Sequence, residues 1–512
     1  MNAQWLKEIR LVMPAWLLAA GLPLAAIFLF PGEIGQGLST FLVGFGCALL
    51  GSSVFGPEFS HGTMEQLLVQ PCERRRIWLM KMTVLAAAMA PFLGVAILAQ
   101  AAWSQEPVML LVVFVPLCAL CATPALTLLA RNGLGATVLT IALPLVLFGS
   151  VVGIVSKVYV NLNDNDSEQI TATLIRASGL VLSLYCVAAC WLGNRLFMRF
   201  QVADARARAL PLEQLLEAPF SGFLHLVFGR RRGAFASLLR KELRLQHASV
   251  LITAAFTIVL VVVIAFLPSL REDYRSVALL LPVVLLAGII PLVMGSLAVA
   301  EERSLGLHAW QLTLPVPLWK QWLAKLLVTF SGSFAFGLVL PWAAVLAGSA
   351  RLGLANSVMS DGFTPVAMTA LAQVLFTAFV IYASTISSTA LRAIMGSIGL
   401  MMAVGLSVSL LGKLLSELQV WIRFGLPGEA FSDWRPVPYL TLGELLVLTG
   451  AGLPLLILLV FAYGNFKRVE IPRQRRWGQV AFLVGPMPVL AIFLPIVVAI
   501  VIGAFVLLWR AA

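Results

Sequence analysis

Long apolar runs separated by short polar segments form the dominant pattern of this chain. A helix needs about 20 mostly apolar residues to cross the hydrocarbon of a bilayer, because every backbone polar group must be satisfied within the segment. By this rule we expect thirteen membrane-spanning helices. They lie near residues 11–31, 37–56, 77–103, 107–130, 134–156, 172–197, 249–268, 277–300, 321–350, 365–391, 393–411, 442–464 and 480–508.

One sparse polar pattern occurs twice, each time after a long apolar run. It consists of a Glu, a Gly, a Pro and a Lys at fixed spacing. Each of these residues recurs 244 positions later, so the two copies align without a gap. The four pairs are Glu58 and Glu302, Gly62 and Gly306, Pro71 and Pro315, and Lys81 and Lys325. An even number of predicted spans separates the copies, so both should have the same orientation. The pattern indicates an internal duplication, which in membrane proteins is typical of transporters.

We therefore expect an all-α polytopic membrane protein with two parallel six-helix repeats and one extra C-terminal span. The first half would cover residues 1–199 and the second half residues 249–479. Residues 200–248 would form a cytoplasmic linker, with an interface helix over 236–246, where leucines alternate with basic residues. The extra transmembrane helix would lie within residues 480–512.

Composition and charge agree with a membrane protein. Hydrophobic residues make up 60% of the 512 and charged residues 11%, against roughly 45–50% and 25% in soluble domains. Most of the 35 Lys and Arg residues fall on the side of the spans that holds the N-terminus, which predicts a cytoplasmic N-terminus in a multi-pass cell-membrane protein. We expect the inner membrane of a bacterium. The net charge of +12 follows from this topology and does not indicate a nucleic-acid partner.

Residues for catalysis or metal binding are not evident. No Asp or Glu lies near the centre of a predicted span, where an ion-driven carrier commonly keeps a carboxylate. The Cys118-x-x-Cys121 pair has no neighbouring His, so we interpret both as apolar packing residues. The string Gly-x-x-x-x-Gly-Lys-Ser/Thr, which wraps phosphates in ATPases, does not occur. We expect no catalytic residue, no metal site and no cofactor in this chain.

The first copy of the repeat also predicts local structure. Thr63 and Gln66 fit a capping box, which would begin a short helix over residues 64–69. Pro71 would end this helix, and Arg74, Arg75 and Arg76 would open the next span at the phosphate level. A plain structural loop with basic flanks explains these features equally well.

The whole string from Glu58 to Lys81 resembles the loop after the second span in permeases of ATP-binding-cassette (ABC) exporters of the type-2 class. The matching residues are Glu58, Gly62, Thr63, Glu65, Leu67, Leu68, Pro71, Arg74, Ile77 and Lys81. In that family the loop carries a coupling helix that docks on the ATPase, and the segment before the first span is an interface helix. The resemblance thus implies a separate ABC ATPase partner, expected in two copies, which would bind ATP and Mg.

The second copy keeps only part of this string. It retains Glu302, Gly306, Leu312, Pro315 and Lys325. Leu307 replaces the Thr and Ala309 replaces the second Glu, so unequal use of the two docking sites is expected. The ATPase-coupling set that the resemblance implies has members in both copies. They are Glu58, Gly62, Thr63, Glu65, Leu67, Leu68, Pro71, Arg74, Arg75 and Arg76 in the first copy, and Glu302, Gly306, Leu312, Pro315 and Lys325 in the second.

The resulting expectation is a permease subunit, not an enzyme itself, that couples ATP hydrolysis to export of an unidentified hydrophobic or lipid-like substrate. The alternative is a secondary carrier of the major-facilitator type, which also joins two six-helix halves. The chain lacks the loop signature Gly-x-x-x-Asp-Arg-x-Gly-Arg-Arg of that family. A membrane-embedded enzyme is a third class, in which His61 would act as a base beside Glu58 and Glu65.

Overall fold

The computed structural model describes residues 3–29, 33–60, 63–70, 72–102, 108–131, 133–161, 167–200, 233–246, 249–250, 253, 257, 261, 272–351, 364–425 and 439–490. These residues are almost entirely helical, and no strand occurs among them. The chain is therefore an all-α protein, as its apolar runs predict.

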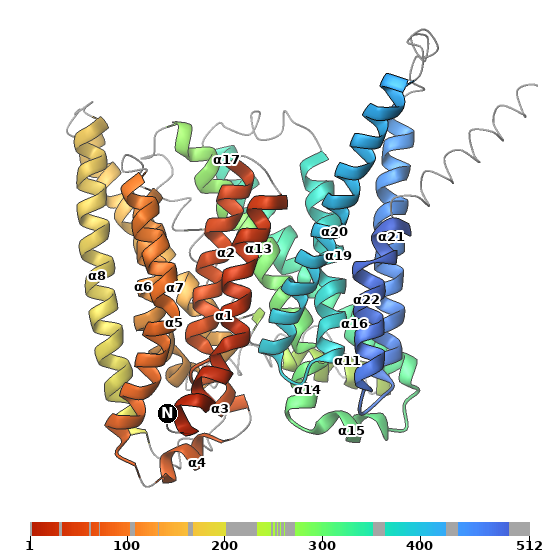
Figure 1. Ribbon diagram of the computed structural model, residues 1–512, viewed down its shortest axis with the longest axis horizontal. Coiled ribbons are helices and arrows are strands. Elements are labelled where there is room, and N and C mark those ends of the chain that lie inside the picture. The colour runs from red at the N-terminus through yellow and green to blue at the C-terminus, as the bar shows by residue number, and fades with distance from the viewer. Residues whose placement is uncertain are drawn as a thin grey trace, which may run out of the picture.

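Helices of the N-terminal part pack against one another in one group. The group contains α1 (Ala3–Leu29), α2 (Glu33–Ser52), α5 (Arg74–Ala102), α6 (Val108–Ala130), α7 (Gly133–Asn161) and α8 (Ser167–Arg199), and in Figure 1 it runs from red to yellow. Two short helices, α3 (Gly56–Ser60) and α4 (Met64–Val69), follow α2.

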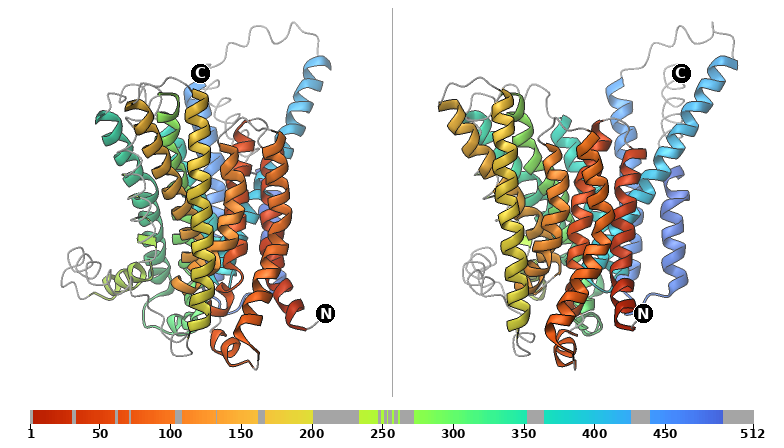
Figure 2. Two further views of the ribbon diagram at one scale, coloured as in Figure 1. Left: turned by 90° about the vertical axis from the view of Figure 1, so that its left-hand side faces the viewer. Right: turned by 60° about the vertical axis from the view of Figure 1, so that its left-hand side comes forward.

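The C-terminal part forms a second group, coloured green to blue in Figure 1. Its long helices are α13 (Glu272–Leu297), α16 (Leu318–Phe334), α17 (Leu340–Arg351), α19 (Thr364–Ile386), α20 (Ala390–Gly425) and α21 (Tyr439–Phe466). Four shorter helices complete it: α11 (Ala234–Leu245), α14 (Ala300–Ser304), α15 (Leu307–Leu312) and α22 (Arg473–Val484). In Figure 2, α20 leans away from the other helices toward its upper end.

Five helical stretches among the described residues are long and apolar enough to cross a membrane. They are Arg74–Gly94, Ala172–Arg199, Leu318–Gly348, Thr369–Ile386 and Ala390–Ser407. Several spans within one chain indicate a membrane protein.

Large hydrophobic clusters hold the helices together. One lies within each group, and another lies between them, where α2 and α7 contact α13, α19 and α20. Two glycines allow helices to approach closely, since a Cβ on Gly51 would overlap Thr123 and a Cβ on Gly295 would overlap Val380. Small residues at helix contacts serve this purpose in membranes.

Some predicted boundaries differ from the structure. The predicted span 321–350 is interrupted by a π-helical turn, η2 (Ala335–Val339), where the Gln373 side chain donates to the Ser333 carbonyl oxygen at 2.6 Å. At the start of the predicted span 480–508 the structure has the short helix α22, which begins at Arg473 and ends at Val484. Most of the predicted span 249–268, residues 201–232 of the linker and residues 491–512 lie outside the described residues.

Candidate functional site

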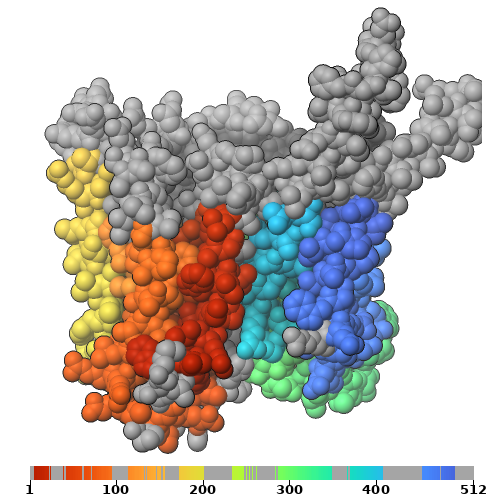
Figure 3. All heavy atoms as spheres, in the orientation of Figure 1, coloured from red at the N-terminus to blue at the C-terminus, as the bar shows by residue number. Residues whose placement is uncertain are grey.

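The two copies of the polar pattern lie at the same end of the bundle. We call this the basal end; it carries α3, α4, α14, α15 and the N-terminus, and it is the lower end in Figure 1. The space-filling view shows two lobes there, orange from the first copy and green from the second (Figure 3).

A buried lysine organises the first copy. Lys81 Nζ, at the basal end of α5, lies 2.8 Å from Glu8 Oε2 of α1 and 2.7 Å from Glu58 Oε1 of α3. It also donates to the Val54 carbonyl oxygen at 2.9 Å. We call Glu8, Glu58 and Lys81 the first lysine cluster. Each of the three is almost fully buried, so the cluster ties three helices together away from solvent.

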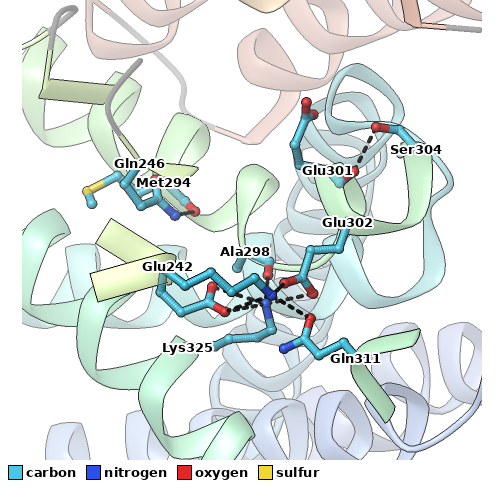
Figure 4. A network of polar contacts seen from close by, with 10 residues as sticks. Glu242, Gln246, Met294, Ala298, Glu301, Glu302, Ser304, Gln311 and Lys325 are labelled. Carbon is cyan, nitrogen blue, oxygen red and sulfur yellow. Dashed lines mark hydrogen bonds and ion pairs between the residues drawn. The ribbon is translucent and has the colours of Figure 1, made fainter. Parts of the chain in front are cut away.

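The second copy builds an equivalent arrangement (Figure 4). Lys325 Nζ of α16 lies 3.0 Å from Glu242 Oε2 of α11 and 2.8 Å from Glu302 Oε2 of α14. It donates to the Ala298 carbonyl oxygen at 2.8 Å. Glu242, Glu302 and Lys325 form the second lysine cluster. The accepting carbonyls of Val54 and Ala298 are separated by the same 244 residues as the two lysines.

The second cluster contains additional charge. Lys241 Nζ lies 2.6 Å from Glu302 Oε1 and donates to Gln311 Oε1 at 3.1 Å. In the first copy Leu67 stands in the position of Gln311, and Lys7, which precedes Glu8 as Lys241 precedes Glu242, is exposed. Both clusters hold two glutamates and one lysine, but the second has Lys241 as an additional cation beside Glu302.

Burial and charge act in opposite directions on the two glutamates of the second cluster. Burial raises the pKa of Glu242 despite the attraction of Lys325. For Glu302 burial also favours the neutral acid, but Lys325 and Lys241 together outweigh it and lower the pKa. The contacts of both lysines thus keep Glu302 ionised, which is the condition for a buried ion pair to hold its geometry.

The short helices of the two copies use the same positions for packing. In α4, Met64 and Leu67 are buried against the core of the first group. In α15 the equivalent positions are His308 and Gln311, and both are also buried. The ring of His308 contacts the ring of Phe466 at 5.5 Å. The predicted short helix over residues 64–69 is thus confirmed, and the second copy contains an equivalent helix.

The outward faces of the two helices differ. On α4, Gln66 and Val69 are exposed, the latter by 72%, and Glu65 is half-buried. On α15, Leu307 is 43% and Trp310 61% exposed. The first copy thus presents polar side chains together with one valine, while the second presents a larger apolar surface.

Several predicted site residues have roles in the structure that their pattern did not reveal. Glu58 is buried on Lys81, so any part that it has in coupling is indirect. Arg74 donates to the carbonyl oxygens of Met198 and Phe200 at 3.0 and 2.9 Å and thereby caps α8, while Arg75 and Arg76 are exposed.

The predicted capping box is wrong, because the Thr63 side chain makes no capping hydrogen bond to α4. The Thr63 N–H instead donates to the Glu58 carbonyl oxygen at 2.9 Å, which fixes the turn through the backbone. Gly306 has a left-handed φ of 69°, a conformation that glycine adopts without strain. Gly62, Pro71 and His61 lie outside the described residues.

The remaining predicted residues lie close to the short helices. Leu68 is half-buried in the core of the first group, and Leu312 packs in the same way in the second group. Pro315 is exposed in the turn before α16. The predicted sites are therefore brought together in two places, one in each copy.

Glu8 and Glu242 were not among the predicted site residues. The similarity of residues 7–10 to residues 241–244 was visible in the sequence, but nothing there indicated that either glutamate reaches the repeated lysine. Residues 5–10, the segment before the first predicted span, lie within α1 and are continuous with that span. In the second group α11 ends at Leu245, as an interface helix over 236–246 predicts.

No protein-family model matches the chain, and no curated protein or solved structure was found to be similar to it.

Proposed function

We propose that this chain is the membrane subunit of an ATP-driven exporter of the ABC type-2 class, formed by two parallel six-helix units and a further C-terminal span. The basal end would face the cytoplasm, and α4 and α15 would be the contacts for two copies of a separate ATPase. The string from Glu58 to Lys81, which resembles the coupling loop of such permeases, is the sequence support for this proposal.

The observation that carries the proposal is the clamping of each short helix by a lysine cluster. In the first copy, Glu58 holds the helix before α4 and Lys81 holds the helix after it, while Glu8 joins both to α1. A force applied to α4 would therefore move α1 and α5 as one body, because the loop cannot yield at either end. Buried ion pairs of this kind resist separation, since breaking one leaves an uncompensated charge.

The second copy supports the same role. Glu302 and Lys325 clamp α15 in the same way, with Glu242 of α11 in place of Glu8. Hydrophobic or lipid-like molecules remain the expected substrates, and the chain itself would bind neither ATP nor Mg.

Copurification tests the proposal. The chain should be isolated in mild detergent from its native membrane, and a protein with a phosphate-binding Gly-rich loop should be recovered with it in comparable amount. Glu65→Lys should reduce both this recovery and the ATPase stimulation, because it reverses a charge on the outward side of α4. The matched control is Arg195→Glu, a charge reversal at an exposed side chain of α8. Unchanged recovery of the ATPase with Glu65→Lys would refute the coupling role of α4.

A further inference from the structure

A polar cleft at the basal end of the second group lies beside α15 but is separate from the second lysine cluster. It has a volume of about 540 Å³ and opens between α14–α15, the turn before α20 and the segment before α22. Its lining includes Arg303, Arg392 and Arg476, together with the hydroxyl side chains of Ser387 and Ser388.

Three arginines from three helices line this cleft. Arg303 comes from α14, Arg392 from the first turn of α20 and Arg476 from α22. Glu470 is the carboxylate among the lining residues, so the wall has an excess of positive charge. Burial, together with the nearby charge of Arg476, lowers the pKa of Arg303 to about 10, so Arg303 is still charged at neutral pH. Such a wall is stabilised when an anion enters.

The hydrogen-bond donors in the cleft are only partly used. Arg303 Nη2 reaches the carbonyl oxygens of Asn465 and Arg468 at 3.4 and 3.3 Å, but its buried Nε has no partner. Arg392 Nη1 donates to Ser388 Oγ at 2.8 Å, and Arg476 Nε donates to the Ile471 carbonyl oxygen at 3.1 Å. Each guanidinium carries five N–H groups, so most remain available to a ligand.

His308 also lines the cleft and is 3% exposed. Neither ring nitrogen makes a hydrogen bond of good geometry in the described structure, although the Arg468 backbone lies close enough to raise the pKa of His308. Buried polar groups without full partners are uncommon in folded proteins. His308 therefore adds to the unused polar groups of the cleft, which include the buried Nε of Arg303.

The first group differs from the second at the position of Arg303. Phe59 stands in the position of Arg303, and its ring contacts the ring of Phe200 at 6.0 Å. The Arg131 guanidinium lies over the ring of Phe200, 5.7 Å from its centre. In the first group, Phe59 therefore packs against an aromatic ring at the position where the second group has Arg303.

We propose that this cleft binds a phosphate group, either on a lipid headgroup or on a soluble compound. Guanidinium forks match the oxygen geometry of phosphate and donate pairs of hydrogen bonds to it, and serine hydroxyls add further donors. Three arginines from separate helices offer more hydrogen-bond donors than a ligand with one carboxylate can accept. They suit a phosphate, which has several free oxygens. A bound phosphate would join α14, α20 and α22 at the basal end.

Native mass spectrometry of the purified chain tests this inference. Phosphatidic acid should be retained more strongly than phosphatidylcholine, and inorganic phosphate should compete for the site. Arg392→Gln and Arg476→Gln, both on exposed side chains, should together weaken retention, by about tenfold for each guanidinium removed. The matched control is Arg195→Gln with Arg199→Gln, which removes two exposed charges from the end of α8.

The outcomes distinguish the two sources of phosphate. Selective retention of phosphatidic acid that the first pair of substitutions abolishes supports a lipid headgroup. Binding of inorganic phosphate with the same sensitivity, but without lipid retention, supports a soluble phosphate compound. Equal weakening in both variant pairs, or no binding of either probe by the unsubstituted chain, overturns the inference. No outcome depends on an ATPase, so the test is independent of the proposed exporter function.

Discussion

Lys81 and Lys325 each stabilise two glutamates in a buried site, and the two sites differ in how much they depend on that one lysine. In the first cluster Lys81 is the cation for both Glu8 and Glu58. In the second cluster Glu302 has a further partner in Lys241. Removing the central lysine should therefore have unequal effects.

Lys81→Met is expected to destabilise the protein by about 3–5 kcal/mol, the usual effect of leaving buried charge uncompensated. Lys325→Met should cost less, because Lys241 continues to neutralise Glu302. Thermal unfolding in detergent measures both. As a control, a triple variant that combines Lys81→Met with Glu8→Gln and Glu58→Gln should recover most of the lost stability. Equal destabilisation by Lys81→Met and Lys325→Met would contradict the difference between the clusters.

His308 predicts a dependence on pH in the second copy. Burial and the positive charge of Arg303 lower the pKa of His308 below its ordinary value of 6.5, and Lys325 acts in the same direction. Glu302 and the backbone of Arg468 oppose them but do not outweigh them. The unfolded chain then binds the proton more readily, so the stability of α15 should fall as pH decreases through the range below 6.5. Amide exchange in Leu307–Leu312, corrected for its intrinsic rate, should increase severalfold between pH 7.5 and about 5.5.

His308→Phe is the matched control for this effect. It keeps a ring against Phe466 but has no titratable group, so exchange in α15 should become insensitive to pH in this range. If the pH dependence persists in the variant, another group is responsible.

The helices α4 and α15 hold equivalent places but offer different surfaces to a partner. Glu65 and Gln66 make the α4 surface mainly polar, whereas Leu307 and Trp310 make the α15 surface mainly apolar. Contacts between exposed charges weaken as salt is added, while apolar contacts do not.

High salt should therefore weaken the α4 contact with the proposed ATPase more than the α15 contact. Single cysteines at Gln66 and Ala309, both exposed, provide positions for crosslinking each helix to the partner across a salt series. Yields at Gln66 should fall first between about 0.1 and 1 M salt, where the screening length falls from about 10 to 3 Å. A parallel decrease at both positions would show that the two contacts have the same character.

The two groups of helices share an apolar contact through the middle of the molecule. Leu42 and Phe45 of α2 belong to the same cluster as Leu286 and Ile290 of α13. The lysine clusters lie on either side of this contact at the basal end, one in each group. A change at α4 and α15 would thus act on two bodies that meet at one apolar surface, which suits rocking of one group against the other.

Transport by the reconstituted complex should require ATP and the partner ATPase, and it should persist when proton and sodium gradients are collapsed. The physical reason is the absence of Asp and Glu near the centres of the predicted spans, where a coupling ion would bind. Fluorescent lipid movement in proteoliposomes, with and without ionophores, measures this. Movement driven by an ion gradient in the purified chain alone would establish the secondary carrier.

Much of this architecture followed from the sequence, because membrane helices depend on local composition. Runs of about 20 apolar residues can satisfy their backbone only as helices, so the all-α class and most helix positions were predictable. The short helix at residues 64–69 was also predictable, since polar residues and a proline bound it on both sides. The repeat of Glu58 and Lys81 in Glu302 and Lys325 was visible as spacing alone.

Only the tertiary structure decided what these repeated residues contact. Spacing along the chain does not place Glu8 beside Lys81, which lies 73 residues away, because that contact requires α1 to pack beside α5. It likewise could not bring Arg303, Arg392 and Arg476 into one cleft, since each comes from a different helix. Helix formation is local and can be predicted from a run of residues, whereas ion pairs and clefts depend on which helices become neighbours after packing.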